Sequence, residues 1–330
     1  MRRMLNSTEA RLTIVLVVVC AVLALASNQF LTLANFSNLL AASAVNLIFA
    51  VGLVVVLIAG GIDISFAVAA SVVQYLTVYA LGMVDGGNWA FGFVFAGLIG
   101  IGLGAINAAL IYYFRIISIV VTIATFNAFF GLLMFFTGGR YIYDLPEWWT
   151  QRIVFFEVKT PSGWAELTLP GVVMIVAALA TWALINRTNI GRQLYAFGDN
   201  PEGARREGIN VAAMTFIAFC WMGLMAGIAG LMQVNFVKEV VPSALLGREL
   251  DVLAAVVLGG ARLGGGRGSV LGCVLGVLLV AIIQNGLNLL GVSPYAFKMV
   301  IGAFILFAIS SSNPTGGFSQ CSPVPAGLAQ

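Results

Sequence analysis

Few side chains in this sequence could carry out covalent chemistry. The 330 residues contain no histidine, 13 acidic residues and 4 cysteines. Cys20, Cys220 and Cys273 lie inside apolar runs, where a free cysteine behaves as a small hydrophobe. No Cys-x-x-Cys or Cys/His spacing occurs, and the acids are scattered, so neither a metal cluster nor a nucleophile–base pair is indicated. We therefore expect no catalytic activity, no metal site and no cofactor bound by this chain.

One glycine-rich run invites comparison with a nucleotide-binding loop. The run GGARLGGGRGS, residues 259–269, lacks the G-x-x-x-x-G-K-[ST] pattern and follows no predicted strand, so we expect no ATP site there. Helix packing is the alternative role for glycine in a membrane protein. Gly268, Gly272 and Gly276 recur at every fourth residue, which predicts a smooth helix face. The pairs Gly60–Gly61 and Gly259–Gly260 are assigned to the same packing role.

Asp63, in the segment GGIDIS, is the acid placed most deeply among apolar residues. An ionisable residue at membrane depth is a functional candidate by default. The two glycines before it imply a helix break, and an acid at a helix start is favoured by the exposed N–H groups. Two roles are open for Asp63: it could lock this turn, or it could contact a solute or gate. We expect no proton relay, because the sequence indicates no second buried acid.

Uncharged polar side chains are more numerous within the apolar runs. Amides and hydroxyls offer hydrogen-bond donors and acceptors without fixed charge, which suits a neutral, hydroxyl-rich solute. Hydrogen bonding between helices is the simpler role for any single one of them. As a group they predict a polar substrate path that comprises Asn46, Asp63, Ser65, Gln74, Asn107, Thr122, Asn127, Gln284, Asn285 and Asn288.

These side chains need a scaffold in the membrane. Apolar residues make up 61% of the chain and charged residues 9%, with a mean hydropathy of +1.03. A soluble domain carries about a quarter charged residues. We therefore predict an all-α, polytopic membrane protein of about ten transmembrane helices. The predicted spans are 12–30, 38–60, 63–84, 89–114, 117–138, 169–187, 213–235, 250–262, 269–290 and 294–312.

The span count ranges from eight to ten, because 250–262 is too short to cross about 30 Å of hydrocarbon as a straight helix. Two short segments could be re-entrant. The segments VVVLIAGGIDIS and LAAVVLGGARLG each end an apolar run with paired glycines, which indicates two pseudo-repeated halves. We place a single transmembrane domain at 12–312.

The distribution of Lys and Arg predicts the orientation of the chain. An even span count with both termini in the cytoplasm places most of the 16 basic residues inside, as the positive-inside rule requires. Residues 1–11 are then a cytoplasmic N-terminus, 139–168 an external loop, and 188–211 a cytoplasmic loop. The tail 313–330 is uncharged and rich in Pro, Gly and Ser, so we expect it to be disordered. The N-terminal apolar run resembles a signal peptide, but we expect it to be retained as the first span.

The cytoplasmic loop contains a stretch with strong helix signals, YAFGDNPEGARREGINV, from Tyr195 to Val211. Asn200 can cap a helix, Pro201 suits its first position, and Gly208 can end it after about two turns. So short a helix is unstable alone, and it has no continuous apolar face for a membrane surface. Docking on a cytoplasmic protein explains these caps best; an ordinary capped loop is the alternative.

This stretch resembles the coupling helix of permease subunits in bacterial ABC importers for monosaccharides, of the ribose, galactose and autoinducer-2 type. The blocks AGGIDIS, VVTIATFNAFFGLLMFFTGG, RTNIGRQLYAFGDNPEGARREGINV and LDVLAAVVLGGARLGGGRGSVLGCVLG also resemble that family, in order. The resemblance covers about residues 35–310. It implies a non-catalytic permease of the bacterial inner membrane that passes a monosaccharide or similar neutral solute into the cytoplasm.

The resemblance also implies partners. ATP-binding cassette subunits would dock below and hold ATP and Mg, a periplasmic sugar-binding protein would deliver solute, and a second permease, identical or not, would pair with this chain in the lipid bilayer. No nucleic acid is involved. The residues implied to couple to the ATPase are Asp199, Asn200, Pro201, Glu202, Gly203, Ala204, Arg205, Gly208 and Ile209.

The sequence departs from the family in one block: relatives continue GGID-S with Val-Gly-Ser, and this chain has Phe66, Ala67 and Val68. A bulky ring thus replaces small residues near the predicted helix break. The second functional reading is an ion-coupled secondary transporter of a small polar solute. Such a transporter needs ion-coupling groups in the membrane and no capped cytoplasmic helix.

Overall fold

The computed structural model describes residues 8–84, 87–161 and 163–293, together with 296, 298, 299, 302 and 303. Eight helices in this part of the chain are long and apolar enough to cross a membrane. They are α1 (Thr8–Ala26), α2 (Leu33–Ile58), α3 (Phe66–Met83), α4 (Trp89–Phe114), α5 (Ser118–Thr137), α7 (Leu169–Arg187), α10 (Val211–Val237) and α12 (Val270–Leu289). The prediction of a polytopic helical membrane protein is confirmed.

The exact count of about ten spans, within the predicted range of eight to ten, is not confirmed. The segment predicted at 250–262 is α11 (Arg248–Leu258), whose 11 residues cover about 16 Å, roughly half of the hydrocarbon thickness. The segment predicted at 294–312 lies largely outside the described residues, as do residues 1–7 and the tail 313–330. Within the described ranges the count is therefore eight spans and one half-length helix.

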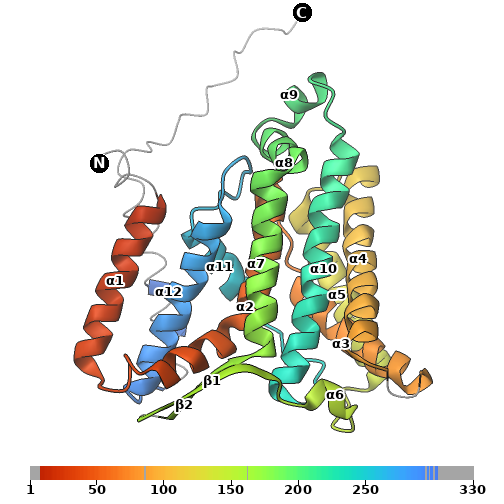
Figure 1. The fold of residues 1–330 in the computed structure, drawn as a ribbon. Helices are drawn as coiled ribbons and strands as arrows, with labels where there is room; N and C mark the ends of the chain where they lie inside the picture. Colours follow the sequence, from red (N-terminus) through yellow and green to blue (C-terminus); the bar gives the residue numbers. More distant parts are fainter. Residues whose placement is uncertain are drawn as a thin grey trace, which may run out of the picture.

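Two ends of the bundle are distinguished by their loops (Figure 1). The top of the view carries α8 (Asn189–Asp199) and α9 (Pro201–Arg206). We call residues 188–211 the coupling loop, after the predicted role of this segment, and this side of the bundle the coupling-loop end. The hairpin end, at the bottom, carries α6 (Glu147–Thr150) and the strands β1 (Val154–Thr160) and β2 (Gly163–Thr168). The first turn of α1 lies at the coupling-loop end, in agreement with the predicted orientation of that helix.

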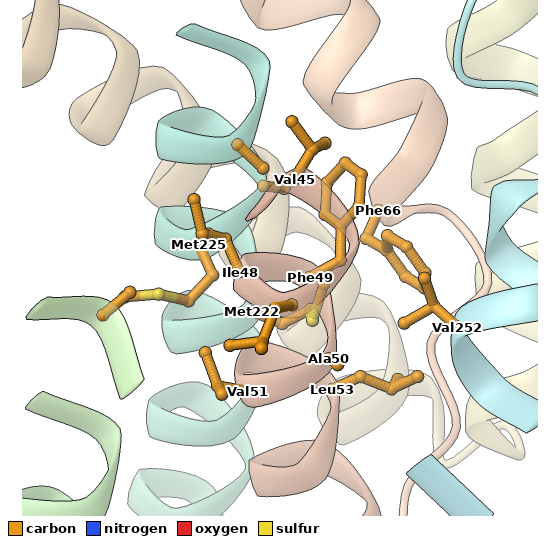
Figure 2. Close-up of a cluster of buried hydrophobic side chains, with 14 of the residues drawn as sticks. Val45, Ile48, Phe49, Ala50, Val51, Leu53, Phe66, Met222, Met225 and Val252 are labelled. Carbon is orange, nitrogen blue, oxygen red and sulfur yellow. The ribbon is translucent and has the colours of Figure 1, made fainter. Parts of the chain in front are cut away.

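Helix α2 forms the centre of the bundle because its second half, from Leu47 to Ile58, is apolar on every side. All its residues from Ser43 to Ile58 are buried except Asn46. Figure 2 shows Met222 and Met225 of α10 on one side of α2, with Phe66 of α3 and Val252 of α11 on the other. The Phe66 ring packs against Phe49 with ring centroids 5.0 Å apart, and it is buried in this core.

Helices α4 and α10 are held together by glycines that sequence reasoning did not single out. A Cβ added at Gly100 would lie 2.1 Å from the Gly223 carbonyl oxygen, and one at Gly223 would lie 2.0 Å from that of Gly100. Gly104 and Gly227 make equally close backbone contacts. Each helix thus presents a G-x-x-x-G face, which permits close packing where lipid supplies no hydrophobic driving force.

The glycine face predicted at residues 268–276 is only partly correct. A Cβ at Gly272 would lie 2.2 Å from the Gly259 carbonyl oxygen, and one at Gly276 would lie 2.2 Å from that of Ala255, so both glycines do pack α12 on α11. Gly268 precedes the helix, because Ser269 caps α12 by accepting the Gly272 N–H at 2.9 Å. The stripe therefore has two members on the helix.

The all-α fold carries one small β element, in the predicted external loop, 139–168. It contains the antiparallel hairpin β1–β2, in which Phe156 lies opposite Leu167 and Lys159 opposite Trp164. The loop is anchored by Trp149 of α6, which is fully buried and donates its Nε1–H to the Leu231 carbonyl of α10 at 3.0 Å. Short strands with mostly exposed side chains carry no clear alternation of apolar and polar residues, so the sequence did not reveal them.

Candidate solute cavity and coupling loop

A polar cavity of about 580 Å³ lies between α2, α11 and α12. This volume falls within the roughly 300–1,000 Å³ of sites for small molecules. Four of the predicted path residues line it, and amides and small apolar side chains make up most of its wall. The full lining is Asn38, Leu39, Ala42, Ser43, Asn46, Asp251, Val252, Ala255, Val277, Val280, Ala281, Gln284, Asn285 and Asn288.

Helical spacing explains why these residues share one cavity. Asn38, Ala42 and Asn46 recur at every fourth residue of α2, so they lie on one face, and Asn46 is about 12 Å deeper than Asn38 at about 1.5 Å per residue. Gln284 and Asn288 repeat the same spacing on α12. Asn38 and Asn288 are exposed, and both belong to the parts of these helices that lie toward the hairpin end. The cavity therefore runs from the hairpin end into the middle of the bundle.

Hydrogen bonds hold two of the lining amides in place. Asn285 of α12 and Asn35 of α2 exchange reciprocal amide hydrogen bonds of 3.0 Å, which join these helices beside the cavity. Deeper in the bundle, the Nη1–H of Arg248 donates to Asn46 Oδ1 at 3.2 Å. Glu249 is buried, and its carboxylate accepts the N–H of Gly247 at 3.0 Å. The start of α11 is thus fixed against the middle of α2.

At the coupling-loop end, α9 has the geometry that its sequence predicted. Asn200 Oδ1 accepts the Gly203 N–H at 3.0 Å, and Pro201 occupies the first helical position. The helix closes where Gly208 takes a φ of +82°, which favours glycine, and the Ile209 N–H donates to the Ala204 carbonyl at 3.0 Å. Ala204 is buried against the protein, whereas most of the remaining surface of α9, including Glu202 and Arg205, is exposed.

The coupling loop rests on the protein through glycine backbones. A Cβ added at Gly198, near the end of α8, would lie 1.8 Å from the Ile58 carbonyl oxygen, where α2 ends. One added at Gly265, in the loop between α11 and α12, would lie 2.4 Å from the Gly198 carbonyl oxygen and 2.8 Å from Gly60 Cα. The Gly266 N–H also donates to the Ile58 carbonyl at 3.0 Å. We call Gly60, Gly198 and Gly265 the glycine junction.

A tyrosine adds a side-chain contact to this junction. Burial, together with the carboxylate of Glu9, raises the pKa of Tyr195 above its ordinary value, so the phenol stays protonated. Its O–H donates to the Gly268 carbonyl at 2.6 Å. The Glu9 carboxylate in turn accepts the Ser269 hydroxyl at 2.5 Å. The loop that follows α11 is therefore held by α8 on one side and by α1 on the other.

A family model described as the permease component of the branched-chain amino acid transport system matches residues 35–309. The chain belongs to this permease family. The ribose import permease protein of Escherichia coli strain K12 is 33% identical over 320 residues, which cover 92% of this chain and 94% of that protein. No solved structure matches the permease significantly.

Two further relatives are similar to this permease over 92% of its chain, and their names specify other solutes. The autoinducer 2 import system permease protein of Photorhabdus luminescens is 29% identical over 309 residues, 92% of this chain and 89% of that protein. The galactose/methyl galactoside import permease protein of Escherichia coli strain K12 is 27% identical over 315 residues, with coverages of 92% and 93%. The chain that contains the polar cavity is thus similar, over nearly its full length, to import permeases for ribose and for galactose.

The remaining predicted path residues of the permease do not line this cavity. The largest group fixes the turn between α2 and α3: Asp63 Oδ1 accepts the N–H and the hydroxyl of Ser65, both at 2.7 Å. Asn107 of α4 donates to the Ser65 hydroxyl at 2.8 Å, and Thr122 of α5 donates to the Ile62 carbonyl at 3.2 Å. In this structure the Asp63 carboxylate holds the turn, and a role in transport stays a prediction.

Two other predicted path residues lie apart from both groups. Gln74 of α3 is buried and donates to the Gly230 carbonyl of α10 at 3.2 Å. Asn127 is exposed on α5 and donates to the Ile123 carbonyl of its own helix at 2.8 Å. The structure therefore divides the predicted path into the cavity residues, the turn residues and these two separate amides.

Charged residues that sequence reasoning missed lie in the cavity wall and beside it. The expectation that Asp63 has no buried acidic companion was wrong, because Glu249 is buried and Asp251 lines the cavity. Arg248 opens the same helix. The signal available in the sequence was the run RELD at the start of a segment too short to span the membrane. A short helix that begins inside a transporter is where solute and ion sites are found.

The predicted pseudo-repeat has a local structural counterpart. Helices α2 and α11 end in the same way, with the Gly61 N–H bonded to Val56 O at 3.0 Å and the Ala261 N–H bonded to Val256 O at 3.3 Å. The left-handed residues are Gly60, with a φ of +83°, and Gly260, with a φ of +93°. By backbone conformation, Gly60 therefore corresponds to Gly260. Aligning the two glycine pairs in the sequence would instead match Gly60 with Gly259, so the two alignments differ by one residue.

Proposed function

We propose that this permease is the membrane-spanning subunit of an ATP-driven importer that passes a monosaccharide or a similar neutral, polyhydroxylated solute. The observation that carries the proposal is that α2 and α11 reach both candidate sites. Their side chains Asn46 and Asp251 line the cavity, and the end of α2 and the loop that follows α11 meet at the glycine junction beneath the coupling loop. The names of the relatives, which specify ribose and galactose import, support this solute class.

Coupling follows from the contacts of the loop. An ATPase subunit that binds the exposed surface of α9 would move α8, since Asn200 joins the two helices directly. Backbone contacts at the glycine junction leave no flexible side chain to absorb that movement. The end of α2 and the loop that follows α11 would then shift together and reshape the cavity. Binding energy shifts a conformational equilibrium only when it differs between the two states, so α9 must fit the ATPase better in one of them.

The remaining parts of the importer come from partners. ATP and Mg would be held by the ATPase subunits, and hydrolysis would occur there. A solute-binding protein would approach the hairpin end, where the cavity begins, and a second permease would complete the passage. This arrangement places the chain in the bacterial inner membrane with α9 in the cytoplasm. The similarity to import permeases over more than nine-tenths of the chain supports these assignments.

The test is reconstitution of the permease in proteoliposomes, alone and with its ATPase and solute-binding subunits. We expect labelled D-ribose, D-galactose or a related sugar to enter only with all subunits and ATP. We also expect the ATPase subunit to co-purify with the permease in mild detergent. Uptake driven by a proton or sodium gradient without an ATPase would refute the proposal and favour the secondary transporter.

A further inference from the structure

The cavity has one charged group in its wall. Among the described residues that line it, Asp251 alone is ionisable, and the other polar groups are amides and the Ser43 hydroxyl. No hydrogen bond or ion pair within the described residues engages the Asp251 carboxylate. A carboxylate offers two oxygens that accept hydrogen bonds, which matches a pair of neighbouring hydroxyls on a solute. Arg248, three residues earlier on the same helix, interacts electrostatically with Asp251. No hydrogen bond among the described residues occupies the carboxylate oxygens, so both can accept from a solute in the cavity.

The nearest cations lie beside the cavity wall and not in it, although the charge of Arg248 offsets part of the charge of Asp251. Arg248 is not among the lining residues; its guanidinium is turned to Asn46 Oδ1, at 3.2 Å. The Lys298 Nζ lies beside Gly247, 3.9 Å from where a Cβ would stand, and it also does not line the cavity. Glu249 is occupied by the N–H of Gly247. An anion inside the cavity would therefore meet the Asp251 carboxylate before it met a cation.

The Arg248 contact also determines what Asn46 can offer. The amide oxygen of Asn46 accepts from Arg248, so its NH₂ group is left to donate to a solute. The guanidinium is always charged and presents its donors in a fixed plane, so it holds the amide in one orientation. Asn46 as a donor and Asp251 as an acceptor together complement a hydroxyl group, which both donates and accepts.

We propose that Asp251, together with the Asn46 amide that Arg248 orients, makes the cavity selective for uncharged polyhydroxylated solutes and excludes their anionic derivatives, such as sugar phosphates and sugar acids. Asp251 and Asn46 are specificity-determining residues, and Arg248 is a positioning residue. The identity of the solute rests on the proposed function. The charge selectivity does not, because it is a property of the cavity that small charged reagents can measure.

The experiment uses the full-length permease in detergent or liposomes, with Cys20, Cys220, Cys273 and Cys321 replaced by serine or alanine. Gln284→Cys then places one thiol in the cavity wall. Its labelling rate is measured with a cationic and an anionic methanethiosulfonate reagent, each normalised to the rate with a free thiol in solution. We expect the cation to react at least about tenfold faster, because a like charge nearby in a partly buried site repels the anion.

Three variants test whether Asp251 causes the difference between the labelling rates of the cationic and the anionic reagent. Asp251→Asn should bring the two rates within about threefold of each other, and Asp251→Glu should keep the preference for the cation. The matched control is Asp63→Asn, which neutralises a buried acid outside the cavity and should leave the ratio unchanged. If Asp251→Asn leaves the ratio unchanged, or if neither reagent labels Gln284→Cys, the proposal is overturned.

Solute protection tests the rest of the proposal. D-ribose at millimolar concentrations should slow the labelling of Gln284→Cys, whereas ribose 5-phosphate should not. Arg248→Ala should abolish this protection and Arg248→Lys should partly restore it, while the charge ratio, which depends on Asp251, stays above unity in both. Equal protection by the two sugars overturns the proposed selectivity. A normal charge ratio without protection by any neutral sugar refutes the proposed solute class and leaves the charge selection by Asp251 standing.

Discussion

Replacement of Gly198 by alanine tests the glycine junction most directly. The added Cβ would lie 1.8 Å from the Ile58 carbonyl oxygen. A carbon and a carbonyl oxygen in contact are ordinarily about 3.3 Å apart, so α8 and the end of α2 must separate by roughly 1.5 Å. Such overpacking costs about 1–3 kcal/mol. The separation also strains the hydrogen bond from Gly266 to Ile58, which is worth about 1 kcal/mol.

The total, about 2–4 kcal/mol, corresponds to a change of about 30-fold to 1,000-fold in the ratio of docked to undocked coupling loop. We expect Gly198→Ala to insert and purify normally, because Gly198 lies outside the eight spans and contacts only the last residue of one of them. ATP hydrolysis by the assembled complex should continue, but sugar uptake per ATP should fall at least about tenfold. The assay measures both rates in the same proteoliposomes.

The matched control is Gly102→Ala in α4, where an added Cβ has no neighbour within 4 Å. Alanine is better than glycine in a helix by about 1 kcal/mol, so this variant should be as stable as the parent and transport at the same rate. If Gly198→Ala couples hydrolysis to uptake as well as Gly102→Ala does, the junction does not transmit movement and the proposed coupling route is wrong.

Three further predictions concern the packing and the caps. Gly223→Ala places a Cβ 2.0 Å from the Gly100 carbonyl oxygen, so it should destabilise the packing of α4 on α10 by about 1–3 kcal/mol. The unfolding temperature in detergent should therefore fall, and an unchanged temperature would contradict this packing. Asn200→Ala removes the cap of α9, worth about 1 kcal/mol, and should raise tryptic cleavage at the exposed Arg205 about fivefold, whereas Asn200→Asp should behave as the parent. Trp149→Phe leaves the buried Leu231 carbonyl without its indole donor and should lower the stability by about 1–3 kcal/mol, measured by thermal unfolding. A variant as stable as the parent would show that this hydrogen bond does not anchor the external loop.

Local features of the sequence were sufficient to predict the coupling helix. Its start and end depend on Asn200, Pro201 and Gly208, whose capping roles involve partners within a few residues. Rules for caps therefore gave both boundaries of α9. The membrane class followed from composition, since 9% charged residues cannot cover a soluble surface. The charge distribution likewise predicted that α1 begins at the same end as α9.

The composition of the cavity wall was predicted in part, but its assembly was not. Polar residues in apolar runs identified Asn46 and Gln284, yet nothing local separates them from Gln74 or Asn127, which lie elsewhere. A helix that is apolar all round does not indicate which side faces its neighbours. Asp251 was missed because its helix is too short to be recognised as a span.

The sequence by itself determined most of the elements: the apolar segments that form the eight spans of the described residues, the capped helix α9 and the glycine-terminated ends of α2 and α11. Only the tertiary structure decided which backbones meet, such as Gly100 with Gly223 and Gly198 with Ile58, and which polar groups share the cavity. The physical reason is distance along the chain. Caps and hydropathy depend on neighbours in sequence, whereas Asn46 and Arg248 meet only because α2 and α11 pack together.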